Sequence, residues 1–266
     1  MKNLAEKVAL KSVAIPYDSL KKISQKNKYS LYLLGHIFNE IMALGKLSVM
    51  SQMKVGDGSD ITEVERAGYV FNSMFFLRLL AGKIYEAQLS LRSKDVHDFL
   101  RDFCYPNMEA SDCGLLKTFN KEASGCRWLN AARNGHAMHY PTFAQCEKVI
   151  GQLDAGRQPF EFFMGERVGN TLYRSSDVMA GASFLMEADG ESWRGGLEVA
   201  LADLQRLSEL LAEFITESIH GFAEGRKKGK VRYSEKLKIK DVKKFSTPNI
   251  NDFELPYFMS LGDDKK

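Results

Sequence analysis

The sequence predicts a mainly α-helical protein with a small inserted β-hairpin or meander, and three observations support this. Apolar residues recur at steps of three and four over long stretches, which is the spacing of one buried helix face. Hydrophobic residues make up 44% of the 266-residue chain, enough for a sizeable core. At about residues 159–187 the pattern changes to short apolar runs between turn residues, which is typical of strands.

These patterns divide the chain into three parts. Residues 1–28 are a polar lead-in with one short helix, residues 29–223 form the helical domain that contains the β insertion, and residues 224–266 are a basic tail. No internal repeat interrupts this order. We therefore expect a single helical body with an extension at each end.

Two long helices are predicted first. From Tyr29 to Gln52 the apolar residues fall on one face, and the pattern stops at the glycine pair of residues 56–58. Ser59 or Asp60 then offers a helix N-cap before a long helix over residues 64–91. The expected core face of this second helix consists of aromatic and leucine residues, namely Phe71, Phe75, Leu79 and Leu80.

The later helices are predicted from the same periodicity. A short helix is expected over residues 95–103, and a loop with one helical turn over residues 107–121. The run from Glu122 to Met138 is compatible with one helix, and Thr142 caps another that reaches Leu153. Residues 192–223 return to a strong helical repeat.

Strands are expected in the insertion and in the tail. Residues 159–164, 171–174 and 182–186 are short apolar or aromatic runs, with a turn between the first two. Residues 236–240 alternate lysine with apolar residues, as an edge strand does. The insertion is therefore expected to be a small hairpin or meander.

Positive charge is concentrated in one part of the tail. Residues 226–244 hold ten lysine or arginine residues against two acids, whereas the whole chain carries a formal charge of only +3. Such an arm can follow a nucleic-acid backbone, with Tyr233 and Phe245 as stacking rings. The alternative interpretation is a solvated tail without a partner.

Cysteine content and the N-terminus indicate the compartment. The four cysteines form no Cys-x-x-Cys pair, which favours a reducing environment. The first residues lack the apolar core of a signal peptide, and charged residues interrupt the longest apolar stretches. We therefore expect a cytoplasmic protein with no membrane segment.

The stretch of residues 126–141 is where the sequence suggests chemistry. Arg133, Asn134, His136 and His139 gather at the end of a predicted helix. On a regular helix Arg133 and His136 are neighbours on the surface, and His139 lies further round. A permanent cation beside groups that titrate near neutral pH suits phosphate chemistry, because RNA cleavage needs a base, an acid and a cation for the developing phosphoryl charge.

The order of elements and this stretch resemble the HEPN superfamily, in particular its RNA-cleaving toxins and abortive-infection proteins. Their mark is an arginine, often followed by a polar residue, and a histidine after four to six further residues. Arg133, Asn134 and His139 match that pattern, Tyr140 fits the aromatic that often follows, and the resemblance covers roughly residues 29–223. The insertion is not a core part of the family.

The resemblance implies a function and a partner. It implies a metal-independent endoribonuclease that dimerises, so that two arginine–histidine pairs face one cleft, within phage defence or a toxin–antitoxin pair. Arg133 would hold the scissile phosphate, His139 would be the general acid or base, and Asn134 and His136 would support them. RNA, a second copy of the chain and an antitoxin or defence partner are the expected partners, and no cofactor or metal is expected. A non-catalytic nucleotide- or RNA-binding module is the alternative.

Other interpretations of the same residues stay open. His136 competes with His139 for the catalytic role, and histidine and asparagine also stabilise helix C-termini without any catalytic role. His136 and His139 could instead bind a metal with Cys126 or Cys146, or Cys126 could be a nucleophile. A third function is a structural helical protein whose basic tail anchors it to nucleic acid.

Charged residues also interrupt the predicted second long helix. Arg78 and Glu86 are the most notable of them, and two interpretations apply. They can be boundary residues whose charged tips reach water. Alternatively, one of them lies beside the later histidines.

Overall fold

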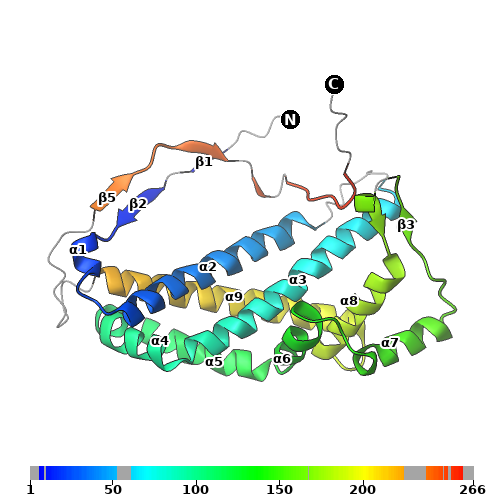
Figure 1. Ribbon diagram of the computed structural model, residues 1–266, viewed down its shortest axis with the longest axis horizontal. Coiled ribbons are helices and arrows are strands. Elements are labelled where there is room, and N and C mark those ends of the chain that lie inside the picture. Colours follow the sequence, from blue (N-terminus) through cyan, green and yellow to red (C-terminus); the bar gives the residue numbers. More distant parts are fainter. Residues whose placement is uncertain are drawn as a thin grey trace. The chain divides into compact units, whose positions relative to one another are not determined.

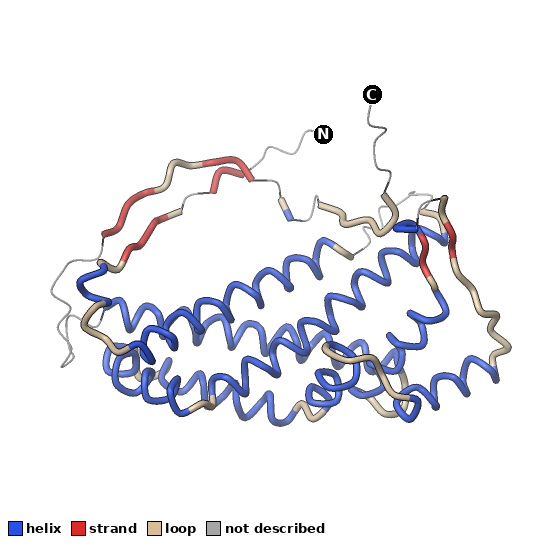
Figure 2. The backbone as a smooth tube through the Cα atoms, in the orientation of Figure 1, coloured by secondary structure: helices blue, strands red, loops and turns tan. Residues whose placement is uncertain are grey.

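The computed structural model describes residues 6–8, 10–52, 61–166, 168–224, 238–247, 249–250 and 253–259. This part of the chain is mainly helical, with strands only in short two-stranded sheets (Figure 1 and Figure 2). The prediction of a mainly α fold is therefore confirmed, and its assignment to the HEPN type stays a prediction. Within the described ranges no helix combines the length and the apolar content that crossing a membrane requires.

The elements follow one another in a simple order. The α-helices are α1 (Tyr17–Leu20), α2 (Gln25–Met50), α3 (Glu63–Leu91), α4 (Lys94–Phe99), α5 (Leu115–Gly125), α6 (Trp128–Ala132), α7 (Phe143–Ala155), α8 (Arg174–Ala188) and α9 (Trp193–Glu224). Two π-helical turns are η1 (Leu100–Cys104) and η4 (Arg133–Ala137), and short 3-10 turns are η2 (Tyr105–Asn107), η3 (Asp112–Gly114) and η5 (Val168–Asn170). The strands are β1 (Glu6–Val8), β2 (Lys11–Ala14), β3 (Phe163–Met164), β4 (Thr171–Leu172), β5 (Lys238–Asp241) and β6 (Phe245–Thr247).

The chain packs as two compact units. The first unit comprises Met1–Met42, Lys83–Cys126 and Leu204–Asn249, and the second comprises Ala43–Gly82, Arg127–Asp203 and Ile250–Lys266. Helices α2, α3 and α9 each give one part to each unit. The predicted helical region 29–223 therefore contributes to both units.

The first unit is built on the predicted apolar helix faces. Buried side chains of the N-terminal part of α2 recur at the expected three- and four-residue steps, as do those of the C-terminal part of α9. The buried residues are Leu31, Leu34, Ile37 and Ile41 of α2, and Leu204, Leu207, Leu211, Phe214, Ile215 and Phe222 of α9.

Two strands near the start of the chain pair with two strands of the C-terminal region in this unit. Strand β2 pairs antiparallel with β5, so that Val13 lies opposite Ile239, and β1 pairs antiparallel with β6. The strand predicted over residues 236–240 is thus present from Lys238. Residues 225–237, which hold most of the predicted basic arm and Tyr233, lie outside the described residues.

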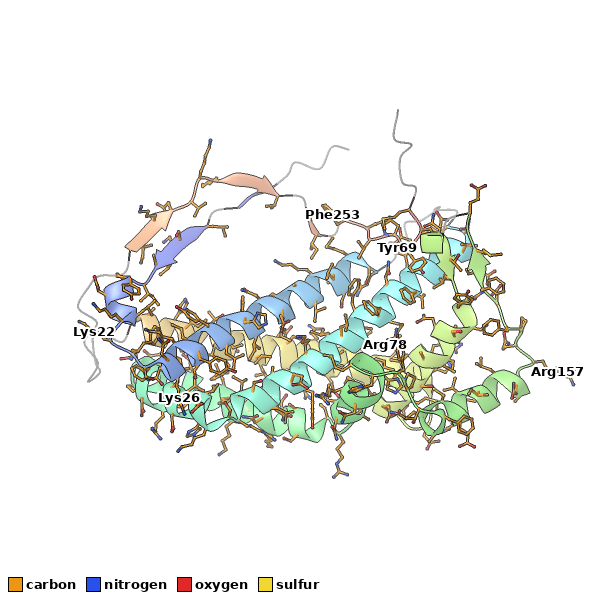
Figure 3. The ribbon with its side chains drawn as sticks, viewed as in Figure 1. Lys22, Lys26, Tyr69, Arg78, Arg157 and Phe253 are labelled. Carbon is orange, nitrogen blue, oxygen red and sulfur yellow. The ribbon has the colours of Figure 1, made fainter. Side chains whose placement is uncertain are left out.

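In the second unit a C-terminal segment over residues 253–259 fastens to α3 and to the hairpin of β3 and β4. The Tyr69 hydroxyl donates to Glu254 at 2.9 Å, near the start of this segment at Phe253 (Figure 3). The Tyr257 hydroxyl donates to the carbonyl of Thr171 in β4 at 2.8 Å. Side-chain hydrogen bonds therefore hold this segment in place.

The start and core face of α3 differ from the sequence predictions. Thr62 caps the helix in a reciprocal pair with Glu65, whereas Ser59 and Asp60 lie outside the described residues. Phe75 is exposed and stacks on Phe71, so the expected core face is shifted. Leu80 is buried as expected, and the rest of the buried face follows small and aliphatic side chains, namely Met74, Leu77, Ala81, Ile84, Ala87 and Leu91.

Three further predictions about the elements are wrong. Residues 182–186 are not a strand but the last part of α8, which buries Phe184 and Leu185. The loop expected over residues 107–121 ends where α5 begins at Leu115. The run from Glu122 to Met138 is not one helix, because Cys126 leaves the helical region with ψ at 72° after Gly125. By contrast, the Thr142 cap of α7 is confirmed.

Candidate functional site

The predicted site lies on the π-helical turn η4. Helix α6 buries Trp128, Leu129 and Ala132 and continues into η4 without a break. The Met138 N–H donates to the carbonyl of Arg133, five residues earlier, at 3.3 Å. A single π turn within a helix is rare and is frequent at functional sites. Arg133, Asn134 and His136 therefore lie on an uncommon backbone turn.

Three of the four predicted site residues lie on the outward side of η4 or in the bend that follows it. Arg133 is half-buried, and its Nη1 donates to Oδ1 of Asn134 at 2.7 Å. The amide of Asn134 in turn donates to Asn130 at 2.7 Å, so the guanidinium is oriented by a chain of side chains. His139 is exposed in the bend that follows, beside Tyr140, whose side chain is 97% exposed.

His136 lies on the inward side of the turn. Its side chain is 0% exposed, and its Nε2 atom is 3.6 Å from a carboxylate oxygen of Glu187 in α8. Neither ring nitrogen has a hydrogen-bond partner, and the ring packs edge-on against Phe184 with centroids 6.0 Å apart. The expectation that His136 is a surface neighbour of Arg133 is therefore wrong. The longer i to i+5 turn changes which residues share a face.

A buried ion pair lies in the same unit, close enough to act on this histidine. Arg78, midway along α3 (Figure 3), is 3.5 Å from Asp177 of α8, and their side chains are only 11% and 13% exposed. The Arg78 charge opposes protonation of His136. Arg78 and His136 belong to the same unit, and the interpretation that Arg78 lies beside a later histidine stays a prediction. Glu86 belongs to the other unit, so its part of that interpretation stays a prediction.

Burial sets the protonation state of these groups. Burial lowers the pKa of His136, Glu187 raises it in opposition, and Arg78 lowers it further. Burial also raises the pKa of Asp177, against the opposite effect of Arg78. His136 is therefore neutral at neutral pH, although the Glu187 carboxylate lies 3.6 Å from its Nε2 atom.

Two glycines allow the turn to pack this closely. A Cβ atom at Gly82 of α3 would lie 2.7 Å from the Cβ of Ala137, so α3 can approach η4 only with glycine there. A Cβ atom at Gly135 would overlap the side chain of Gln145. Gln145 accepts the N–H of Thr142 at 3.0 Å and donates to Glu187 at 3.4 Å, so it connects the α7 cap to the carboxylate.

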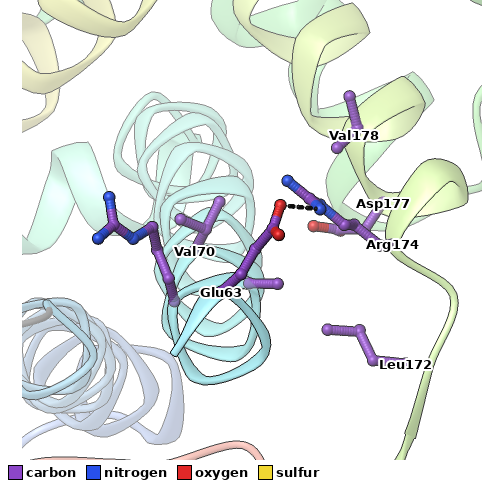
Figure 4. A pocket seen from close by; sticks show the side chains of 8 residues that line it. Glu63, Val70, Leu172, Arg174, Asp177 and Val178 are labelled. Carbon is purple, nitrogen blue, oxygen red and sulfur yellow. Dashed lines mark hydrogen bonds and ion pairs between the residues drawn. The ribbon is translucent and has the colours of Figure 1, made fainter. Parts of the chain in front are cut away.

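A pocket of about 510 Å³ opens between the N-terminal part of α3 and the start of α8 (Figure 4). Arg174 donates to Glu63 at 2.6 Å and to Glu161 at 2.5 Å at its side. Asp177 lines the pocket and also belongs to the buried ion pair, so one end of that pair reaches the pocket. The other lining residues are Arg66, Ala67, Val70, Leu172 and Val178.

No family model, curated protein or solved structure matches the chain. The HEPN resemblance therefore stays a prediction based on the motif and on the order of the helices.

The described residues show no group of three or more His, Cys, Asp or Glu side chains arranged to hold a metal ion. The two candidate cysteine ligands, Cys126 and Cys146, are both buried thiols.

Sequence reasoning missed the Glu187 and Asp177 carboxylates. Both lie in α8, in the region where the sequence predicts a β insertion. The missed signal is the acidic residue in the first turn after Arg174, together with the helix-favouring composition of residues 179–188.

Proposed function

We propose that the protein is a metal-independent endoribonuclease of a defence or toxin–antitoxin system, in which two copies of the chain form one RNA-cleaving cleft. The observation that carries this proposal is the outward side of η4. Arg133 is oriented by Asn134 and Asn130, and His139 and Tyr140 are exposed in the next bend. A fixed guanidinium, an accessible imidazole and an exposed ring are the groups that would bind phosphate, move a proton and stack on a base.

The reaction assigns one role to each group. The RNA 2′-oxygen attacks phosphorus while its proton passes to a base, and the 5′-oxygen leaves with a proton from an acid. His139 supplies one of these proton transfers. Arg133 stabilises the charge that builds on the phosphoryl oxygens, and Asn134 keeps its guanidinium in place.

The burial of His136 bears on the oligomeric state. Two proton transfers need two groups, and within residues 126–141 only His139 is an accessible histidine. His136 is buried and cannot reach RNA in this structure. The proposed cleft therefore takes its second histidine from a second copy of the chain.

A binding module that does not cleave RNA is the second candidate. The specific observation in its favour is that one chain presents a single accessible histidine in the motif beside exposed rings. Tyr140 and Phe143, at 97% and 70% exposure, would stack on bases whether or not the phosphate is cut. In that case Arg133 would contribute affinity alone.

Cleavage assays with matched variants test the proposal. Purified protein is incubated with RNA in EDTA, beside Arg133→Ala and His139→Ala. The controls are Arg194→Ala and His97→Ala, which remove exposed residues elsewhere. The proposal expects cleavage by wild type and both controls, and a loss of 100-fold or more in the two site variants, on the order of a general acid–base or electrostatic contribution.

The other outcomes separate the candidates. If wild type binds RNA without cutting it, and Arg133→Ala loses that binding, the module is correct and the nuclease is not. If wild type and all four variants behave alike, both candidates are refuted.

A further inference from the structure

On the interior side of η4, the protonation of one residue, His136, would change its interactions with the charged residues Glu187 and Arg78. The His136 ring has no exposed surface and no hydrogen-bond partner, one carboxylate lies 3.6 Å away, and the Arg78 cation acts on it from α3. The charged groups that act on the ring are Glu187 of α8 and Arg78 of α3; Arg78 pairs with Asp177 of α8, and Glu187 accepts a hydrogen bond from the uncharged Gln145 of α7. A neutral ring is tolerated there, whereas an imidazolium has two N–H groups to satisfy.

We propose that His136 is a proton-operated positioning residue: while neutral it holds η4 in the form that presents Arg133 and Asn134, and when protonated it rearranges the turn through Glu187.

The structure provides a path for this rearrangement. An imidazolium attracts Glu187, whose carboxylate is partly exposed and able to move, but Arg78 repels the same charge. Glu187 also accepts from Gln145, and Gln145 caps α7 through Thr142. A shift of Glu187 therefore reaches the start of α7, beside the exposed Tyr140 and Phe143. The shared backbone of η4 carries the same change to Arg133.

The close packing makes the change discrete. Ala137 contacts Gly82, and Gln145 fills the space above Gly135, so the turn has no room for small adjustments. The protonated form must either bring the carboxylate to the ring or move the ring outward. Each alternative displaces a side chain that is now packed against the turn.

Trp128 offers a direct signal for this change. Its ring lies 5.9 Å from Phe184, the same ring that packs against His136. The second tryptophan, Trp193, is partly exposed and can be removed as Trp193→Phe. In that background the fluorescence of Trp128 is followed from about pH 8 to pH 5, a range that spans the titration of histidine.

The proposal expects one fluorescence transition with its midpoint below 6.5, the ordinary histidine value. His136→Gln should abolish it. His139→Gln, which changes an exposed histidine three residues away, should leave it intact. Glu187→Gln should move the midpoint to lower pH, because the carboxylate favours the charged ring. This variant serves as the test if His136→Gln does not fold.

Other results overturn the proposal. It fails if wild type shows no transition in this range, if the transition survives His136→Gln, or if His139→Gln removes it. An unchanged or raised midpoint in Glu187→Gln also contradicts it.

The consequence for RNA rests on the proposed function and is measured separately. Affinity for a fluorescent single-stranded RNA should fall through the Trp128 transition in wild type, and should stay level over the same pH range in His136→Gln, which lacks the transition. If Trp128 responds and RNA affinity does not, the coupling to the surface is refuted. If no RNA binds at any pH while the Trp128 transition is present, the proposed function fails and the proton response of η4 stands.

Discussion

The two π-helical turns, η1 and η4, share one backbone arrangement but bury side chains of different chemical type. Each continues directly from a short α-helix, η1 from α4 and η4 from α6. Turn η1 buries Leu100 and the thiol of Cys104, and turn η4 buries the imidazole of His136. Burial strongly raises the pKa of Cys104, so that thiol stays neutral, whereas burial lowers the pKa of His136.

Both turns are also met by a glycine from a long helix. A Cβ atom at Gly221 would lie 2.8 Å from the carbonyl oxygen of Cys104, and one at Gly82 would lie 2.7 Å from the Cβ of Ala137. The π turn with its glycine contact is thus a packing device that occurs in each unit. What distinguishes η4 is the group it buries and the charges around that group.

The largest expected effect on stability is the loss of the buried Arg78–Asp177 ion pair, compared with the loss of the surface ion pairs that Arg101 of η1 forms. Arg78→Met leaves Asp177 buried without its cation and should lower the free energy of unfolding by about 3 kcal/mol. Arg101, a residue of η1 itself, pairs with Asp98 and Asp102 at the surface, so Arg101→Met should cause no measurable loss. Urea unfolding followed by circular dichroism measures both.

A double variant distinguishes charge burial from packing in this prediction. Arg78→Met with Asp177→Leu removes both charges and should recover most of the stability that Arg78→Met loses. A double variant as unstable as the single one would show that the two residues act through packing alone.

The next effect concerns the glycine contacts, where the two turns should behave alike. Gly82→Ala and Gly221→Ala should each destabilise by about 1–3 kcal/mol, because neither the Ala137 Cβ nor the Cys104 carbonyl can move aside easily. Gly45→Ala in α2, with nothing within 4 Å of the new atom, should instead gain about 0.5–1 kcal/mol. Thermal unfolding of the three variants shows whether the change in stability depends on the close contact at each site or simply on replacing a helical glycine.

A smaller effect on stability, confined to acidic pH, should distinguish η4 from η1, because η4 buries a histidine and η1 buries a thiol. Because the pKa of His136 is lowered on folding, the unfolded chain binds a proton more readily there. The buried, neutral His136 therefore contributes fully to the free energy of unfolding above pH 6.5. This contribution is lost as the pH falls toward the pKa of His136 in the folded protein, at up to about 1.4 kcal/mol per pH unit.

The variant His136→Leu should remove this part of the pH dependence, and Cys104→Ala should not. Urea unfolding at about pH 7.5, 6.5 and 5.5 measures the slopes. Equal slopes for wild type and His136→Leu would contradict the assigned protonation state.

The smallest effect on stability is expected at the exposed ring. Tyr140→Ala removes a side chain that is 97% exposed and should change the free energy of unfolding by no more than about 0.5 kcal/mol. If this ring stacks on a base, RNA binding should weaken by about 1–3 kcal/mol. Fluorescence anisotropy with single-stranded RNA checks the affinity, and an unchanged value would exclude Tyr140 from the RNA surface.

The long helices were predictable because their signal is local. The Leu31, Leu34, Ile37 and Ile41 repeat of α2 appears in the sequence as it does in the core, and so does the Thr142 cap of α7. Helix α8 was missed because the short apolar run over residues 182–186 resembles a strand when it is considered alone, whereas the alanine, methionine, leucine and glutamate residues over 179–188 favour a helix.

The candidate site was predictable in part. Arg133, Asn134, His136 and His139 stood out by residue type, but the faces on which they lie depend on a π turn that has no local sequence signal. The burial of His136 further depends on Gly82, Phe184 and Glu187, which come from distant parts of the chain. Only the tertiary packing brings these residues together.

The most direct test of a neutral, turn-positioning His136 is its titration by NMR in the full-length protein. Histidine ring signals are assigned by comparison with His136→Gln, and the backbone amides of residues 133–140 are followed in the same samples. We expect the His136 ring to titrate below pH 6.5 and the Arg133 and Asn134 amides to shift with the same midpoint. A midpoint at or above 6.5, or amides that do not follow the ring, would contradict the role assigned to His136.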